Sequence, residues 1–218
     1  MLGAQTQPTA GWGRQVNGTT ASAALWYTSR ATGVIALVLL TAVLVLGIMV
    51  SRQGRLPGLP RFAGTSLHRS VSLLSVVFVA VHIATAIADP FVTIGIAASV
   101  VPFISPYEPF WLGIGAVSVD LMLALVVTSL LRARIGRRTW RAVHWLAYGS
   151  WPVAVVHSIY SSQDMQRGPL LGLALACILA VLTAGVWRAA RALAATPRAR
   201  RVPELMADPD LLTRAGHR

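Results

Sequence analysis

The most informative pattern in the sequence lies in residues 67–82, LHRSVSLLSVVFVAVH, and residues 141–157, RAVHWLAYGSWPVAVVH. Each is an apolar stretch with a histidine near either end. These histidines are His68 and His82 in the first stretch, and His144 and His157 in the second. Ionisable side chains are costly inside a membrane and usually mark function there. The four histidines are therefore the first candidates for a functional site.

The composition of the whole chain is that of a membrane protein. Of its 218 residues, 55% are hydrophobic and 12% are charged, which is outside the balance of a soluble domain. All 19 basic residues are arginine, and with 7 acids they give a net charge of +12. Long apolar runs separate the arginine clusters, so the charge indicates membrane topology and not nucleic-acid binding. The expected partner of this surface is the lipid bilayer.

Five segments are long enough to cross a bilayer, which takes about 20 apolar residues. They are 25–50, 67–88, 110–131, 143–160 and 170–187. A further apolar run, 91–104, is shorter and contains Gly95 and Pro102, so we expect a re-entrant or interfacial piece. The sequence thus predicts an all-α integral membrane protein, a bundle of about five transmembrane helices.

The arginines predict the orientation of the bundle. Sixteen of the 19 follow the first, third and fifth spans, and only Arg14, Arg30 and Arg167 lie on the other side. Because arginine accumulates on the cytoplasmic side, the amino terminus is expected outside and the carboxyl terminus in the cytoplasm. Residues 1–24 form an extracytoplasmic segment in this interpretation, and 189–218 a mobile cytoplasmic tail. The lysine-free composition is typical of a GC-rich bacterial genome, so the expected location is the bacterial cytoplasmic membrane.

The spacing of the histidines predicts two levels of metal ligands. His82 follows His68 by 14 residues, about 21 Å along a helix and only about 40° in azimuth. His157 follows His144 by 13 residues, about 19.5 Å. If both spans run outward, His68 lies level with His144 near the cytoplasm, and His82 lies level with His157 near the outer face. Paired imidazoles at two depths suit two six-coordinate b haems, stacked between the second and fourth spans.

Two observations leave alternatives open. Thirteen residues place His144 and His157 about 140° out of phase on a straight helix, so we expect Gly149 and Pro152 to bend or rewind the fourth span. Each histidine taken alone is also compatible with a hydrogen-bonded core residue. The alternative function is a haem-free scaffold or small transporter that uses these histidines for protons or a metal ion. Cys177 is the only cysteine, so covalent haem attachment and iron–sulfur ligation are excluded.

The pattern Leu67-His68-Arg69 through Val81-His82, followed by Arg141-Ala142-Val143-His144 and Val156-His157, resembles the ferric reductase transmembrane superfamily. That superfamily includes NADPH oxidases, ferric reductases and the haem subunit of bacterial periplasmic methionine sulfoxide reductase. The resemblance covers roughly residues 26–187, so 25–188 is the expected haem-binding domain. It implies two haems b and electron transfer from one to the other across the membrane.

The family resemblance also implies partners. Oxidases and eukaryotic ferric reductases continue into a flavin and NADPH domain, and the roughly 30 residues of the tail are too few for one. We therefore expect a membrane component of an oxidoreductase system. A cytoplasmic flavoprotein or quinol would be its donor, and an extracytoplasmic flavin- or metal-containing protein its acceptor. A quinone or flavin would be supplied by these partners.

Other residues are candidates to support the haems. Arg69 and Arg141 adjoin the inner histidines and suit haem propionates, or else they are ordinary cytoplasmic anchors. Arg30 lies at the outer end of the first span, where it suits the outer propionates or snorkels to the interface. Asp120, midway through the third span, is either a proton or quinone contact or a neutral hydrogen-bonded carboxyl.

Small and aromatic residues form a second supporting set. Gly33, Gly47 and Gly149 allow a haem or a helix to approach closely, although glycine is common in membrane helices. Trp145, Tyr148 and Trp151 lie between the histidines of the fourth span, where they either pack on the macrocycles or belong to the interface.

The arginine asymmetry predicts the compartment of two sites. A reporter fused after Arg218 is expected to read cytoplasmic, and one inserted near Gln163 is expected to read extracytoplasmic. Reporter activity in intact cells measures both. The same compartment for the two fusions would contradict the five-span arrangement.

Overall fold

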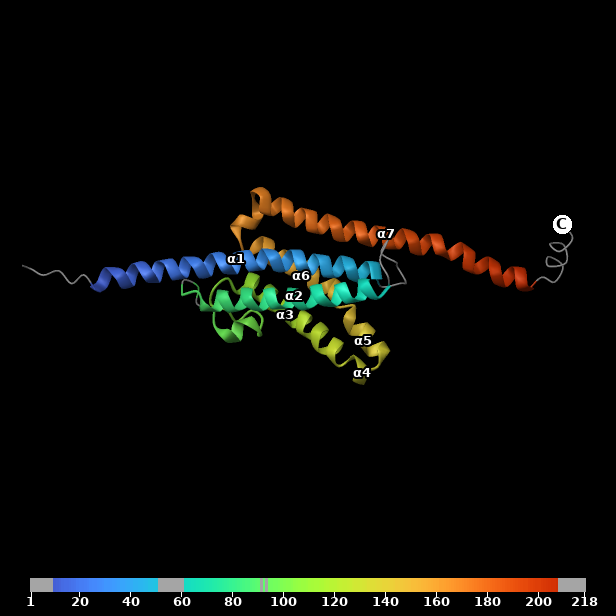
Figure 1. The fold of residues 1–218 in the computed structure, drawn as a ribbon, viewed down its shortest axis with the longest axis horizontal. Coiled ribbons are helices and arrows are strands. Elements are labelled where there is room, and N and C mark those ends of the chain that lie inside the picture. The colour runs from blue at the N-terminus through green and yellow to red at the C-terminus, as the bar shows by residue number, and fades with distance from the viewer. Residues whose placement is uncertain (1–9, 51–60, 91, 93, 208–218) are drawn as a thin grey trace, which may run out of the picture.

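The computed structural model describes residues 10–50, 61–90, 92 and 94–207, and in this part of the chain all regular structure is helical (Figure 1). The predicted all-α fold is confirmed. The elements, in chain order, are α1 (Ala10–Val50), α2 (Arg61–Ala88), η1 (Ile96–Ser99), α3 (Pro109–Leu130), α4 (Arg132–Ile135), α5 (Arg137–His144), α6 (Ala147–Tyr160), η2 (Gln163–Gln166) and α7 (Gly168–Ala207).

Four helices in the described part of the chain are long and apolar enough to cross a membrane. These segments are Ser22–Val50 in α1, Phe62–Ala88 in α2, Pro109–Leu130 in α3 and Gly168–Ala194 in α7. They correspond to the first, second, third and fifth predicted spans. The protein is therefore a multi-pass membrane protein.

The fourth predicted span, 143–160, differs from the expectation because it is not one helix. It is divided between α5, which ends at His144, and α6, which begins at Ala147. The 14 residues of α6 extend about 21 Å, less than the roughly 30 Å of hydrocarbon. The two histidines of this segment therefore lie on different helices.

The helix break lies at Trp145 and Leu146, and not at Gly149 and Pro152 as the sequence predicts. Backbone hydrogen bonds between residues three apart connect Leu146 N to Val143 O at 2.8 Å, Tyr148 N to Trp145 O at 3.1 Å and Gly149 N to Leu146 O at 3.0 Å. Such bonds wind the chain by about 120° per residue instead of about 100°. Four residues wound in this way reduce the offset between the two histidines from about 140° to about 60°.

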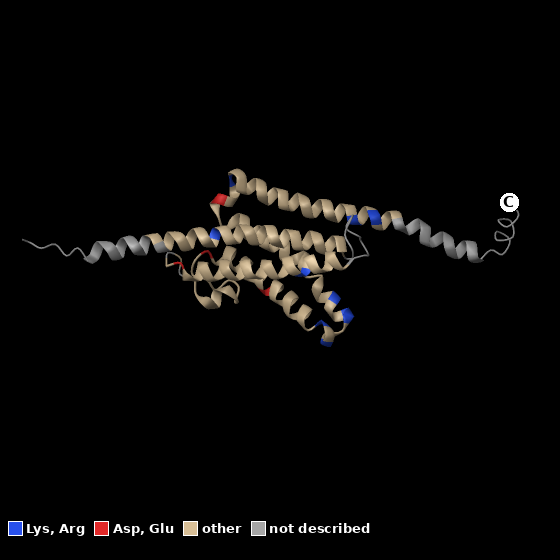
Figure 2. Ribbon diagram, viewed as in Figure 1, with Lys and Arg blue, Asp and Glu red and all other residues tan. Residues whose placement is uncertain are grey.

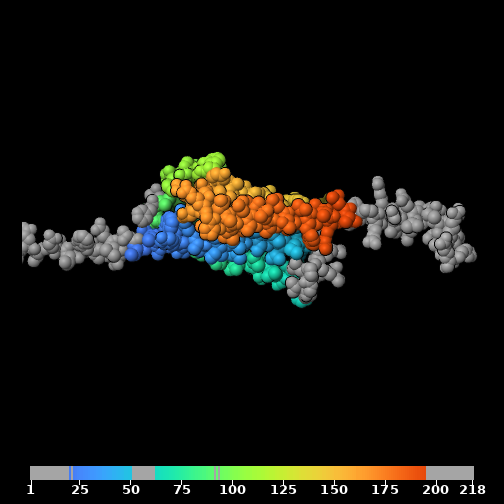
Figure 3. Space-filling model, turned by 90° about the horizontal axis from the view of Figure 1, so that it is seen from above, coloured from blue at the N-terminus to red at the C-terminus, as the bar shows by residue number. Residues whose placement is uncertain are grey.

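α1 is the central helix of the bundle, with α2, α6 and α7 packed around it (Figure 1). α3 packs against α6 on the side away from α7. The buried core lies between α1, α6, η2 and α7, and it is formed by Leu37, Val155, Met165 and Ala174. Figure 3 shows α7 beside α1, and the two helices are in contact along part of their length. α2, in contrast, packs mainly on α1 and leaves its other faces open.

The remaining segments differ in part from expectation. The run 91–104 holds only the short helix η1 in its described residues, so it does not cross the bilayer as a helix. α1 begins at Ala10, inside the predicted 1–24 segment, and α7 continues to Ala207, inside the predicted tail. The mobility and the compartments of these segments stay predictions.

Charges are distributed unevenly along the bundle (Figure 2). Arginines gather on α4, α5 and the C-terminal half of α7, whereas the acidic residues lie mostly toward the opposite end. Gly136, at a φ of 74°, makes the turn between α4 and α5, a backbone conformation that favours glycine. At the arginine-rich end of the bundle, α4 and α5 are thus joined by a tight turn. This is the end that we expect in the cytoplasm.

One hydrogen bond joins α1 to α6 inside the bundle. Trp151 Nε1 donates to Thr41 Oγ1 at 3.0 Å, and Thr41 Oγ1 donates to Leu37 O at 2.8 Å. Trp151 therefore packs toward α1 and the core, and its contact with a macrocycle stays a prediction.

We expect Thr41→Val to lower the free energy of unfolding by about 1 kcal/mol, because it leaves the indole N–H without an acceptor. Reversible unfolding in mixed detergent micelles measures the change. Thr128→Val is the matched control, since the Thr128 hydroxyl bonds only to carbonyls of its own helix. Equal effects of the two substitutions would contradict a role for the interhelical bond.

Candidate cofactor site: two pairs of histidines

The structure brings the four histidines together as two pairs. His68 on α2 faces His144 at the end of α5, and their ring centroids are 6.5 Å apart with the planes at 70°. His82 on α2 and His157 on α6 lie close enough to interact electrostatically. These are the pairs expected if the second and fourth segments run in the same direction.

The separation within the first pair, His68 and His144 (the inner pair), suits a metal ion between the rings. A metal bonded at about 2 Å to one nitrogen of each imidazole places the ring centroids roughly 6 Å apart. The Nδ1 atoms of both rings are buried and accept or donate no hydrogen bond within the described residues. The same is true of Trp140 Nε1, whose ring stacks on His144 with centroids 4.8 Å apart. Three polar nitrogens at this level thus lack a partner in the part of the chain that the structure describes.

The second pair, His82 and His157 (the outer pair), is held by the backbone. His82 Nδ1 donates to the carbonyl of Ser29 at 2.7 Å, and His157 Nδ1 donates to the carbonyl of Trp111 at 2.9 Å. A proton on Nδ1 leaves Nε2 with a free lone pair, which is the form that binds a metal. Both imidazoles are therefore held in the tautomer that a metal ligand needs.

Three glycines lie directly against these rings. A Cβ atom at Gly33 would be 2.9 Å from His82 Nδ1, and one at Gly115 would be 2.7 Å from His157 Nδ1. At Gly47 a Cβ would be 3.3 Å from His68 Cε1. Gly33 and Gly47 are thus close-approach positions, as the sequence suggests, whereas a Cβ at Gly149 would meet nothing within 4 Å.

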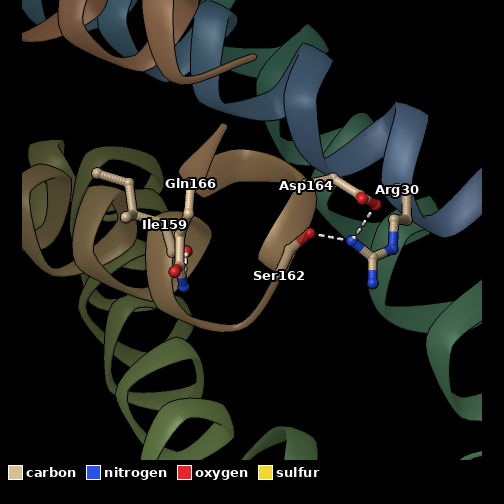
Figure 4. Close-up of polar contacts among 5 residues, drawn as sticks. All are labelled: Arg30, Ile159, Ser162, Asp164 and Gln166. Carbon is tan, nitrogen blue, oxygen red and sulfur yellow. Dashed lines mark hydrogen bonds and ion pairs between the residues drawn. The ribbon is translucent and has the colours of Figure 1, made fainter. Parts of the chain in front are cut away.

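Arg30 binds to the segment that follows α6 (Figure 4). Its guanidinium pairs with Asp164 at 2.9 Å, donates to the Ser162 hydroxyl and lies over the Trp26 ring at 4.4 Å. Gln166, drawn in the same view, donates to the carbonyl of Ile159 at 3.2 Å. These contacts tie η2 to α1 beside the outer pair. The role of Arg30 toward a propionate stays a prediction.

The other predicted supporting residues are placed as follows. Arg69 and Arg141, near the inner histidines in sequence, are exposed, and Asp120 is partly buried on α3. Their roles toward a cofactor stay predictions. Tyr148 accepts a hydrogen bond from Arg188 at 3.0 Å, and its ring contacts Trp145 at a centroid distance of 5.1 Å. Neither aromatic is placed by these contacts against a histidine.

Four site residues are absent from the sequence-based prediction: Ser29, Trp111, Gly115 and Trp140. Ser29 and Trp111 contribute carbonyls to His82 and His157, and the Trp111 ring stacks on Tyr160 with centroids 4.6 Å apart. Gly115 lies on the third span, where glycine alone is no signal. No sequence pattern identifies these residues, because their role depends on the helix that each one faces.

The family described as "ferric reductase like transmembrane component" matches residues 32–155 of the chain. This match includes α2 with both of its histidines, α3 and His144, and it ends two residues before His157. The comparisons with curated proteins and with solved structures find no significant match.

Proposed function

Because the chain belongs to the ferric reductase-like transmembrane family, we propose that it is a dihaem b-type cytochrome, which carries electrons across the membrane for a reductase system. The single observation that carries the proposal is the pairing of four histidines at two levels. His68 with His144 holds the inner haem iron, and His82 with His157 holds the outer one. Haem supplies one-electron redox chemistry at each level.

The donor set favours haem over a bare metal ion. Within the described ranges no group of three or more His, Cys, Asp or Glu side chains is placed to hold a metal. Each pair therefore offers two nitrogens, which is too few for a closed zinc site. A macrocycle that brings four nitrogens of its own requires only two axial ligands from the protein.

The protein groups around the inner pair match the periphery of an anionic cofactor. Arg69 directly follows His68, Arg141 precedes His144 by three residues, and both are exposed. Guanidinium groups suit carboxylates. The Trp140 N–H, unpartnered among the described residues, is a further donor at this level. The charge of these groups therefore favours a bound cofactor whose acidic edge faces the arginine-rich end of the bundle.

Ligation from both sides determines the type of chemistry. A haem held by one imidazole from each helix would have no open position for a substrate. It would supply one-electron transfer without bond formation at the metal. We propose a cytoplasmic flavoprotein or quinol as donor, and an extracytoplasmic flavin- or metal-containing protein as acceptor.

The purified full-length chain is expected to contain two low-spin haems b that dithionite reduces. A pyridine haemochrome assay on a weighed, detergent-purified sample measures the stoichiometry. A folded protein without Soret absorbance would contradict the proposal and favour the haem-free transporter.

Removal of either member of a pair is expected to delete the same spectral component. His68→Ala and His144→Ala should lose the inner haem, because a single imidazole leaves the iron under-ligated. His82→Ala and His157→Ala should lose the outer haem and keep an inner one that is still reducible from the cytoplasmic side. Low-temperature difference spectra and electron paramagnetic resonance compare the four variants. If His68→Ala matches His157→Ala instead of His144→Ala, the pairing is wrong.

A further inference from the structure

Three of the four histidines face the same local arrangement on a neighbouring helix: a backbone carbonyl followed, four residues later, by a glycine. The three arrangements are Ser29 and Gly33 opposite His82, Val43 and Gly47 opposite His68, and Trp111 and Gly115 opposite His157. Gly33 and Gly47 are separated on α1 by the same interval that separates His68 from His82 on α2.

The geometry of the α-helix explains the spacing of four. The carbonyl of a residue accepts the N–H of the residue four positions later, so the Cα of that later residue lies beside the carbonyl oxygen. The oxygen has a second lone pair, which can accept from a donor outside the helix. A Cβ on the later residue obstructs that approach, and glycine leaves it open.

The distances support this explanation at the outer pair. The Nδ1 atoms of His82 and His157 reach their carbonyls at 2.7 Å and 2.9 Å. A Cβ at Gly33 would lie 2.9 Å from His82 Nδ1 and one at Gly115 would lie 2.6 Å from His157 Cε1, both closer than real Cβ contacts. An alanine at either position must therefore displace the imidazole from its carbonyl.

At the inner pair the corresponding contact is weaker. The Val43 carbonyl faces His68, but the approach of His68 Nδ1 falls outside hydrogen-bond geometry. A Cβ at Gly47 would lie 3.3 Å from His68 Cε1 and 3.8 Å from that nitrogen, a tight contact but a looser one than at Gly33 or Gly115. His144 Nδ1 is also unpartnered there, with only the Trp140 ring against it. The protein alone thus orients the histidines of the outer pair more firmly than those of the inner pair.

We propose that Gly33 and Gly115 are positioning residues, which admit His82 and His157 to backbone carbonyls and so assemble the outer site before haem enters. The inner site, in contrast, takes its final geometry only when haem binds. This inference rests on the proposed function, since it assigns an order to the filling of the two haem sites. Hydrogen bonds to the second nitrogen of a metal-bound imidazole also make it a stronger ligand.

The first experiment titrates hemin into the full-length chain, which is expressed under haem limitation and purified in detergent. We expect two steps, the first tighter by about 10-fold or more, the usual effect of such second hydrogen bonds on metal affinity. The tight step should persist in His144→Ala and disappear in His157→Ala. Equal affinities, or a tight step lost in His144→Ala, would overturn the inference.

The second experiment compares glycine variants. Gly33→Ala and Gly115→Ala should weaken the outer haem by about 10-fold or more and raise its reduction potential, because the imidazole loses its hydrogen bond. The inner haem should keep its affinity and potential, which also shows that the variant is folded. Gly47→Ala should weaken the inner haem less than Gly33→Ala or Gly115→Ala weakens the outer one, because the contact at Gly47 is looser.

Gly172→Ala and Gly185→Ala are matched controls on α7, since a Cβ there meets nothing within 4 Å. If Gly115→Ala retains both haems with unchanged potentials, as these controls should, the inference is wrong. If Gly115→Ala loses both haems, the hemin titration decides. A tight step that persists in His144→Ala supports the inference, and one that is lost there overturns it. A wild-type chain that binds no haem instead refutes the proposed function itself.

Discussion

The register between α1 and α2 is the interaction on which the site depends. The two helices pack antiparallel, and the interval from Gly33 to Gly47 on α1 equals the interval from His68 to His82 on α2. His82 thereby meets Ser29 and Gly33, and His68 meets Gly47. A slip of one residue would turn each imidazole by about 100° away from its glycine. Both ligand levels are therefore set by one packing interface.

α2 carries one histidine of each pair and lies outside the packed core. The core of Leu37, Val155, Met165 and Ala174 lies between α1, α6, η2 and α7. α2, which carries one histidine of each pair, contacts mainly α1 and leaves its other faces open. A flat cofactor placed between α2 and the α5–α6 segment would cover apolar surface that no described helix covers. The uncovered side of α2 and the two nitrogens of each histidine pair thus both suit a flat cofactor.

The sequence predicts the features that depend on spacing along one helix. Apolar runs of about 20 residues give the spans, and the two matched intervals between histidines give the two levels of ligands. It misplaces the break in the fourth segment, because the bonds between residues three apart already form at Val143 and Trp145, ahead of both Gly149 and Pro152. Trp111 and Gly115 escape prediction because their role depends on the register between α3 and α6. Arg30 is predicted at the correct end, but its partners Ser162 and Asp164 lie more than 130 residues later in the chain.

The α1–α2 hairpin also bears on how the protein is made. Ser29 and His82 are 53 residues apart, so their hydrogen bond becomes possible once these two helices have entered the membrane. The partner ligands His144 and His157 follow their α2 histidines by roughly 75 residues, which a ribosome adds in about 4 to 15 s at about 5 to 20 residues per second. During that interval the hairpin holds His82 oriented before its partner exists. The inner pair becomes complete when α5 has been synthesised, and the outer pair only when α6 has followed.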